Sequence, residues 1–342
     1  MTPFRLAVVG AGRAGMLHAA NVRRWLAGAE LACVVEPDAA RARQAAAELE
    51  VPALPSLEDA LRRGGIDGVV VTTPTFTHAE LTLLAAGAGV HVFCEKPMAL
   101  TVEECDRMIA AVEDAGVVLQ VGFVRRFQPE FVEARRRIEA GDVGEPMLVK
   151  SLTRGPGLPP PWAHDPRLSN GLLAEVCSHD FDSCRWLAGS EIVRVYAETA
   201  NFKGEERGVR AAGFYDNAVV ALRFASGALG AIDGTCPADF GYDARVEVLG
   251  SEGLLVVGQL PALALLEARA RGAGTVPTWS SWPQRFEQGY REELRAFVEA
   301  ARTGSPPAAG GADGRAAVAA VRAANRSFLE ERPVQVGSEV PA

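Results

Sequence analysis

The stretch FRLAVVGAGRAG, residues 4–15, decides how the chain begins to fold. It opens with an almost continuous apolar run, typical of a strand buried on both faces of a sheet, and ends in a G-x-G-x-x-G turn before a helical segment. In such a turn Gly10 permits the tight reversal, Gly12 lets the backbone approach a pyrophosphate, and Gly15 lets helix and strand pack closely. The stretch therefore predicts a dinucleotide site that also includes Arg13 and Ala14.

Glu36 ends the second apolar strand segment, about 20 residues after the glycines, where a dinucleotide site places an acidic residue. Its carboxylate is expected to accept hydrogen bonds from the adenosine ribose, and its negative charge would repel a 2′-phosphate. NAD is therefore favoured over NADP as the cofactor. Arg41 lies nearby and is a second candidate for cofactor contact, the alternative being a solvated helix face.

The first third of the chain alternates strand-like and helix-like segments. This alternation predicts a doubly wound parallel sheet. After about residue 124 the alternation stops, and the later segments show the polar alternation of antiparallel strands. We expect strands over residues 4–10, 30–36, 67–74, 91–97, 117–123, 145–154, 193–202, 218–236 and 244–257, and helices over 16–26, 38–50, 77–88, 101–116 and 313–331.

Two strand ends carry unusual residues, and ligands of open parallel sheets bind beyond the carboxyl ends of strands. Thr73, Pro74 and His78 follow one strand, and Glu95, Lys96 and Pro97 follow the next. For His78 the alternative is a surface or capping residue. Lys96 is one of three lysines in the chain and stands between a buried strand and a proline. We therefore expect its ammonium to be held at the edge of the cofactor.

Composition limits the function classes. The chain has 342 residues, 48% of them hydrophobic, and a net charge of -8, which argues against a nucleic-acid surface and favours small-molecule partners. No apolar run is long enough for a membrane helix and the N-terminus does not resemble a signal peptide, so we expect a cytoplasmic protein. The six cysteines are scattered without a C-x-x-C pair, which predicts buried thiols rather than zinc ligands or disulfides.

The segment GLLAEVCSHDFDSCRWLAG, residues 171–189, predicts one short helix with three acid–base side chains. Glu175 and His179 are four residues apart and so share a helix face, with Asp182 further along. One interpretation is a polar stripe that lines a cleft; the other is a core histidine satisfied by Asp182. A metal site built on Glu175 and His179 lacks a suitably spaced third ligand, so no metal is expected.

Taken in order, G-A-G-x-x-G, T-P-x-x-x-H, E-K-P, VGFVRRFQP and H-D-F-D resemble the Gfo/Idh/MocA family of oxidoreductases. Three further stretches resemble its inositol and related polyol dehydrogenase branch most closely: RRF at residues 125–127, FGYD at 240–243 and RFEQGYREELRAFVEA at 285–300. The resemblance covers nearly the whole chain. It implies an NAD-binding Rossmann domain over residues 1–124 and an α+β domain over residues 125–342 with an open, mainly antiparallel sheet. That sheet would pack against a partner subunit in a homodimer or homotetramer, and a helix at about 312–331 would pack back on the first domain.

The resemblance also implies the catalytic residues, which would lie across the nicotinamide ring from one another. These are Lys96, Glu175 and His179, where Glu175 replaces the aspartate usual in the family. An imidazole suits transfer of a hydroxyl proton at neutral pH, so His179 is the candidate base. Lys96 would stabilise negative charge on the same oxygen and Glu175 would orient His179. Asn170 stands where the family usually has glycine.

Recognition of a hydroxyl-rich molecule needs several polar side chains. The resemblance suggests Arg125 and Tyr242, and the loop TRGPGLPPPWAHD suggests Arg154 and Asp165. We therefore predict an NAD-dependent dehydrogenase that oxidises a secondary hydroxyl of a polyol, cyclitol or sugar. The alternatives are an NADP-linked reductase of a ketosugar or aldose derivative, which Glu36 opposes, and a noncatalytic NAD-binding regulator, which the presence of Lys96 and His179 opposes. A hydrolase that oxidises its substrate transiently is more remote.

Overall fold

Two folded units make up the protein in this computed structural model, which describes residues 2–258 and 279–337. Unit 1 contains the chain up to Phe127 together with Gln288–Arg315, and unit 2 contains Gln128–Glu287 and the chain from Ala316 onward. The predicted division after residue 124 lies close to the first crossing. Residues 288–315 differ from the prediction, because they return to unit 1.

Unit 1 is built on a six-stranded parallel sheet with strand order β3-β2-β1-β4-β5-β6. This is the strand order of dinucleotide-binding folds, with a switch point between β1 and β4. The predicted alternation is confirmed, although β3 and α3 were not predicted. The elements are β1 Phe4–Val9, α1 Arg13–Trp25, β2 Ala29–Val35, α2 Ala39–Leu49, β3 Ala53–Leu54, α3 Leu57–Arg63, β4 Gly68–Val71, η1 Thr75–Thr77, α4 His78–Gly87, β5 His91–Cys94, α5 Val102–Ala115, β6 Leu119–Val121 and η2 Val124–Phe127.

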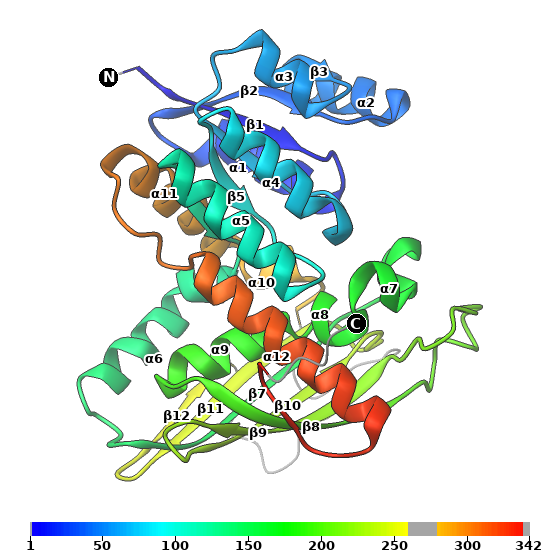
Figure 1. Ribbon diagram of the computed structural model, residues 1–342, viewed down its shortest axis with the longest axis vertical. Helices are drawn as coiled ribbons and strands as arrows, with labels where there is room; N and C mark the ends of the chain where they lie inside the picture. The colour runs from blue at the N-terminus through cyan, green and yellow to red at the C-terminus, as the bar shows by residue number, and fades with distance from the viewer. Residues whose placement is uncertain (1, 259–278, 338–342) are drawn as a thin grey trace. The chain divides into compact units, whose positions relative to one another are not determined.

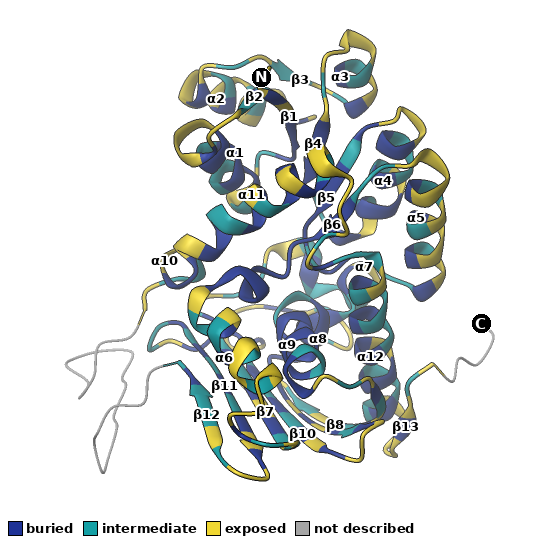
Figure 2. Cartoon of the chain, turned by 90° about the vertical axis from the view of Figure 1, so that its left-hand side faces the viewer, coloured by how far each residue is buried: buried dark blue, intermediate teal, exposed yellow. Residues whose placement is uncertain are grey.

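Local signals explain where these helices begin and end. Thr101 and Glu104 form a reciprocal capping box at the start of α5, and Gly116 ends the helix in the left-handed conformation. The strands are buried between the helices, as Figure 2 shows.

A later helix, α11 Glu287–Thr303, completes the core of unit 1. Its residues Leu294 and Phe297 are fully buried in the cluster that includes Leu6 and Phe93. Gln120 Nε2 donates a hydrogen bond of 2.8 Å to the carbonyl oxygen of Glu293. These contacts explain why residues far along the sequence belong to unit 1.

Unit 2 is built on a seven-stranded sheet with order β12-β11-β7-β10-β9-β8-β13, in which β7 and β10 are parallel and the other pairs are antiparallel. The predicted mainly antiparallel sheet is thus confirmed, while α6 and α10 were not predicted. The elements are α6 Pro129–Glu139, β7 Pro146–Arg154, η3 Pro161–His164, α7 Pro166–Ser169, α8 Gly171–Glu175, α9 Ser178–Ala188, β8 Ile192–Ala200, β9 Asn217–Phe224, β10 Leu229–Thr235, β11 Asp243–Gly250, β12 Leu254–Val257, α10 Trp282–Arg285, α12 Gly311–Glu330 and β13 Val334–Gln335.

The helices of unit 2 lie on one face of this sheet (Figure 1). On β7, Ser151 and Thr153 face α9 and hydrogen-bond to Asp180, whereas the alternate residues Lys150 and Arg154 point to the opposite, open face. Helix α12 belongs to both units: Gly314 packs tightly on Met98 in unit 1, while the part from Ala316 onward lies in unit 2.

Candidate active site

The glycine turn after β1 has the geometry that a dinucleotide site requires. Gly10 has φ +99°, a conformation that favours glycine, and a Cβ on Gly15 would lie 1.8 Å from the carbonyl oxygen of Gly10. A Cβ on Gly12, in contrast, would meet no atom of the described chain within 4 Å. Gly12 also precedes the first turn of α1, which begins with Arg13 and Ala14. The open space at a helix N-terminus fits a pyrophosphate.

Glu36 follows β2 and is held by the backbone of two neighbouring segments. Its carboxylate accepts hydrogen bonds from the N–H groups of Ala11 at 3.0 Å and Asp38 at 2.9 Å. Arg41 Nη2 donates to the same carboxylate at 3.1 Å, from a side chain that is 61% exposed. The acidic side chain therefore lies beside the glycine turn, where a ribose would be bound.

The end of β4 is tied to the glycine turn. Thr72 Oγ1 donates hydrogen bonds to the carbonyl oxygens of Val9 at 2.9 Å and Gly10 at 3.0 Å. Thr73 Oγ1 lies 2.6 Å from Thr77 Oγ1, and Thr77 Oγ1 also donates to the carbonyl oxygen of Pro74. The sheet therefore brings Thr73 and Pro74 to the same edge as the glycines.

His78 has a different role from the predicted cofactor contact. It is buried, with Nδ1 2.9 Å from the carbonyl oxygen of Pro97 and Nε2 2.8 Å from that of Thr73. Burial lowers the pKa of His78, although both carbonyls favour the protonated ring. Because the backbone occupies both nitrogens, His78 links the ends of β4 and β5 and does not present its ring to a ligand.

Glu95 and Lys96 come directly after β5. Glu95 is buried; its Oε1 lies 2.7 Å from His18 Nε2, and its Oε2 accepts the backbone N–H of Lys96 at 3.0 Å. Burial raises the pKa of Glu95, but His18 and Lys96 outweigh this effect and hold the pKa below its ordinary value. Glu95 thus serves as an anionic anchor beneath Lys96, and Lys96 and Pro97 lie at the carboxyl edge of the sheet.

The predicted single helix over residues 171–189 is wrong, because the structure contains two helices there. Helix α8 ends at Glu175 and α9 begins at Ser178, so Glu175 and His179 do not share one regular helix face. Asn170 has φ +59°, a left-handed conformation that asparagine and glycine tolerate best, which explains why either residue suits this position. His179 is 7% exposed on α9, and Glu175 is half-buried at the end of α8.

Asp180 fixes the position of α9. It is fully buried and accepts hydrogen bonds from Ser151 Oγ and, at 2.7 Å, from Thr153 Oγ1 on β7. Asp180 directly follows His179 in the sequence, so this anchor also fixes the backbone position from which the imidazole of His179 extends. Asp182 on the same helix is buried as well.

The residues predicted to bind substrate have different surroundings within their own units. Arg154 forms an ion pair with Asp233 and lies 3.7 Å from Asp243 on the open face of the sheet, away from α9, and its substrate contact stays a prediction. Asp165 caps α7 and pairs with Arg167. Tyr242 is buried against the ring of Phe286 in unit 2, whereas Arg125 is buried in unit 1. For Asp165, Tyr242 and Arg125 a substrate contact stays a prediction.

Sequence reasoning missed three buried titratable residues that support the site. Asp180 is hidden in a segment already rich in polar residues. His18 lies on the buried face of α1, and Glu293 lies between the buried residues Tyr290 and Phe297 of α11. The signal for Glu293 is its place on an apolar helix stripe, where a carboxylate is unusual.

This glycine turn, the acidic residue after β2 and the parallel sheet define a dinucleotide-binding unit of the Rossmann type. Residues 4–123 match the Gfo/Idh/MocA oxidoreductase family with its NAD-binding Rossmann fold, and residues 131–256 match the C-terminal domain of that family. The chain belongs to the Gfo/Idh/MocA family. The predictions of the family, the enzyme class and NAD as cofactor are therefore confirmed.

Similar proteins extend over nearly the full length. The chain is 35% identical to myo-inositol 2-dehydrogenase of Thermotoga maritima, covering 97% of this chain and 98% of that one. It is 36% identical to scyllo-inositol 2-dehydrogenase (NAD(+)) of Bacillus subtilis, covering 97% and 96%. The structure of scyllo-inositol dehydrogenase from Lactobacillus casei with NAD(H) and scyllo-inositol superposes with a TM-score of 0.87 at 26% identity, covering 98% and 100%. Among the described residues, no helix is both long and apolar enough to span a membrane.

Proposed function

We propose that this protein oxidises a secondary hydroxyl of a cyclitol, with NAD as the hydride acceptor. The proposal depends most on the relationship, over nearly the full length, to enzymes named inositol dehydrogenases, one of them solved with NAD(H) and scyllo-inositol. The open cradle at Gly12 and the backbone-anchored Glu36 support the use of NAD. Lys96 and His179 supply the side-chain types that alcohol oxidation needs.

In this proposal each of three residues performs one task. The carbonyl product forms only if the hydroxyl proton passes to a base, and His179 accepts that proton. The Lys96 ammonium stabilises negative charge on the same oxygen and fixes the hydroxyl. Glu175 orients His179 and favours its protonated form. Bound NAD supplies the hydride acceptor, while the protein supplies position and electrostatics.

We also propose that the open face of the second sheet forms a contact between copies of this chain. Leu148, Leu229 and Leu249 lie in one cross-strand row on this face, and Leu229 is 47% exposed. Nearby charges are already paired, as Lys150 is with Glu247 at 3.0 Å. A face with an apolar row and neutralised charges suits a homodimer or homotetramer.

All six cysteines are buried free thiols, which fits the cytoplasmic location that we propose.

A second candidate is oxidation of a sugar hydroxyl in antibiotic biosynthesis. The observation in its favour is the similarity to GenD2 from gentamicin A biosynthesis in complex with NAD, at 28% identity and a TM-score of 0.86 over 99% of this chain and 97% of that one. The same three residues would serve this reaction, so the candidates differ only in substrate.

The test is an assay of NADH formation against a panel of inositols, aminocyclitols and sugars. We expect turnover of at least one inositol isomer and faster turnover with NAD than with NADP. A preference for amino sugars would favour the second candidate. Absence of turnover across the panel, in protein that binds NADH, would contradict both candidates and favour the noncatalytic regulator.

A further inference from the structure

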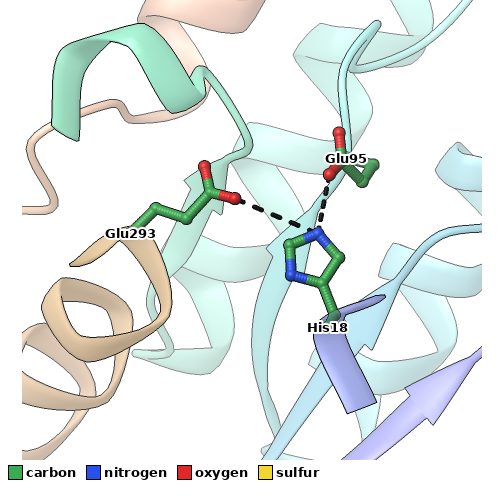
Figure 3. A group of neighbouring side chains, drawn as sticks. All are labelled: His18, Glu95 and Glu293. Carbon is green, nitrogen blue, oxygen red and sulfur yellow. Dashed lines mark hydrogen bonds and ion pairs between the residues drawn. The ribbon is translucent and has the colours of Figure 1, made fainter. Parts of the chain in front are cut away.

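Three buried titratable side chains from distant parts of unit 1 meet beneath the end of β5. They are His18 on α1, Glu95 after β5 and Glu293 on α11 (Figure 3). His18 Nε2 lies 2.7 Å from Glu95 Oε1 and 3.9 Å from Glu293 Oε1. The side chains of His18 and Glu293 are fully buried, and that of Glu95 is 10% exposed. Two carboxyl groups therefore lie close to one imidazole nitrogen, away from solvent.

The two carboxyl groups have unequal partners. Glu95 receives hydrogen bonds from His18 and from the backbone N–H of Lys96. Neither carboxyl oxygen of Glu293 has a hydrogen-bond partner in the described part of the chain, although one of them points toward His18 (Figure 3). An ionised carboxylate in this position would be buried without compensation, which is very costly. A neutral carboxylic acid avoids that cost.

Aromatic rings surround the imidazole of the cluster. The rings of Phe93 and Tyr290 pack edge-on against His18, with centroids 5.2 Å and 5.6 Å away. Cys94, beside Glu95, is neutral because burial raises the pKa of its thiol well above the ordinary value. The positive charge of Lys96 acts on Glu95 and lowers the pKa of its carboxyl group.

We propose that Glu293 is protonated at neutral pH and that His18 is a positioning residue that holds Glu95, and through it the backbone of Lys96. The part that concerns Lys96 rests on the function proposed above. A neutral Glu293 leaves Glu95 as the single anion of the cluster, bound on one side by His18 and on the other by the Lys96 amide. Burial and the negative charge of Glu95 both raise the pKa of Glu293 well above its ordinary value, which agrees with this assignment.

A bound divalent metal ion would be another way to balance two carboxylates, but the geometry fits it poorly. Tetrahedral zinc with bonds of about 2.0–2.1 Å keeps its ligand atoms roughly 3.3 Å apart. The cluster instead has one separation of 2.7 Å, typical of a hydrogen bond, and one of 3.9 Å. Magnesium and calcium need about six or more oxygen ligands, and one oxygen of Glu95 is already engaged by an amide.

Infrared spectroscopy tests the protonation directly, without turnover. The carbonyl stretch of a protonated carboxylic acid is separate from the bands of carboxylates. We expect this band in the wild-type protein at neutral pH, its loss in Glu293→Gln and its retention in Glu299→Gln, a matched change at an exposed position of the same helix. Absence of the band in the wild-type protein would overturn the proposal. So would one equivalent of divalent metal in the purified protein that Glu293→Gln removes.

Two variants of His18 test the positioning role. His18→Phe removes the donor to Glu95, and a lost hydrogen bond to a charged group corresponds to about a tenfold loss, here expected in kcat. NADH affinity, read by fluorescence, should stay within about twofold, and His18→Gln, which restores an N–H donor, should recover most of kcat. If His18→Phe does not fold, Glu95→Gln is expected to show the same loss. An unchanged kcat in the folded variant would overturn the positioning role.

The two experiments also separate this proposal from the proposed function. If the wild-type protein oxidises no polyol, the function fails, but the infrared band still tests the protonation of Glu293. If the wild-type protein is active and the band is absent, only the present proposal fails.

Discussion

The two units anchor their functional side chains in different ways. In unit 1 the anchors are backbone groups at strand ends: Glu36 is held by two N–H groups, and the ring of His78 by two carbonyl oxygens. In unit 2 the anchor of α9 is made by side chains, with Asp180 bound to the hydroxyls of Ser151 and Thr153. A hydrogen bond to a backbone group is kept when the side chain of the residue that provides that group is substituted. We infer that single changes in unit 1 remove one function each, whereas a change at Asp180 displaces a whole helix.

The largest effect is expected for Lys96→Ala. If the ammonium stabilises charge on the substrate oxygen, its loss should lower kcat by about 10²–10³-fold. The alanine variant keeps the backbone N–H that Glu95 binds, so the dissociation constant for NADH should stay near that of the wild type. Stopped-flow turnover and fluorescence titration measure the two quantities. Lys203→Ala, a lysine of unit 2 that pairs with Asp239, is the matched control.

A Lys96→Ala variant with near-normal kcat would remove this residue from the chemistry. A large loss of NADH affinity would instead show that the side chain supports the cofactor site itself. Either result would weaken the distinction between backbone anchoring in unit 1 and side-chain anchoring in unit 2.

Asp180→Ala should destabilise unit 2. It removes the carboxylate that accepts from the buried hydroxyls of Ser151 and Thr153, and a lost hydrogen bond to a charged group costs about 1.5–3 kcal/mol. We therefore expect a lower midpoint of thermal or urea unfolding. We also expect a lower kcat, because the backbone of His179 is adjacent to the residue that the variant removes. Asp180→Asn keeps one acceptor oxygen, so its stability and its kcat should lie between those of the wild type and Asp180→Ala. Equal stability of all three proteins would contradict an anchoring role.

The same contrast explains how much the sequence could predict. The alternation in unit 1 and the glycine turn depend on local patterns, so the sheet, Glu36 and Lys96 were placed from the sequence. The break between Glu175 and Ser178 was not predicted, because the residues from 171 to 189 keep an apolar pattern across it. The use of His78 and Arg154 was also missed, since their partners are backbone carbonyls and aspartates that only the folded sheets bring near.

Long-range contacts also hid the return of residues 288–315 to unit 1. The sequence of α11 predicts an amphipathic helix, but it does not indicate whether Leu294 and Phe297 pack in the core of unit 1 or in that of unit 2. The cluster of His18, Glu95 and Glu293 depends on that packing, so no local pattern predicts it.

Glu293→Gln should change how stability depends on pH. A carboxyl group whose pKa is raised in the folded protein contributes stability below the ordinary pKa of about 4.3, and this contribution is lost as pH rises toward the folded pKa. The glutamine variant cannot ionise in either state. Its stability relative to the wild type should therefore increase with pH, by up to about 1.4 kcal/mol per pH unit within that window. Urea unfolding from pH 5 to 8 measures this difference.

Glu299→Gln, at an exposed position of the same helix, should show little change across the same range. If Glu293→Gln and wild type keep a constant difference in unfolding free energy, Glu293 does not take up a proton on folding. Such a result would mean that unit 1 contains an ionised carboxylate whose compensation lies outside the contacts described above.

The smallest effect is expected for Glu36→Ala, and it tests the backbone-anchored half of the site most directly. The carboxylate holds the N–H groups of Ala11 and Asp38 and would accept hydrogen bonds from the ribose of NAD, so the dissociation constant for NADH should rise about tenfold. NADPH should lose less affinity, because the variant also removes a negative charge that repels the 2′-phosphate and releases Arg41 from its ion pair. Fluorescence titration with both nucleotides measures the ratio, with the exposed Glu50→Ala as control. Equal losses for NADH and NADPH would mean that Glu36 acts by holding the glycine turn and not by selecting the nucleotide.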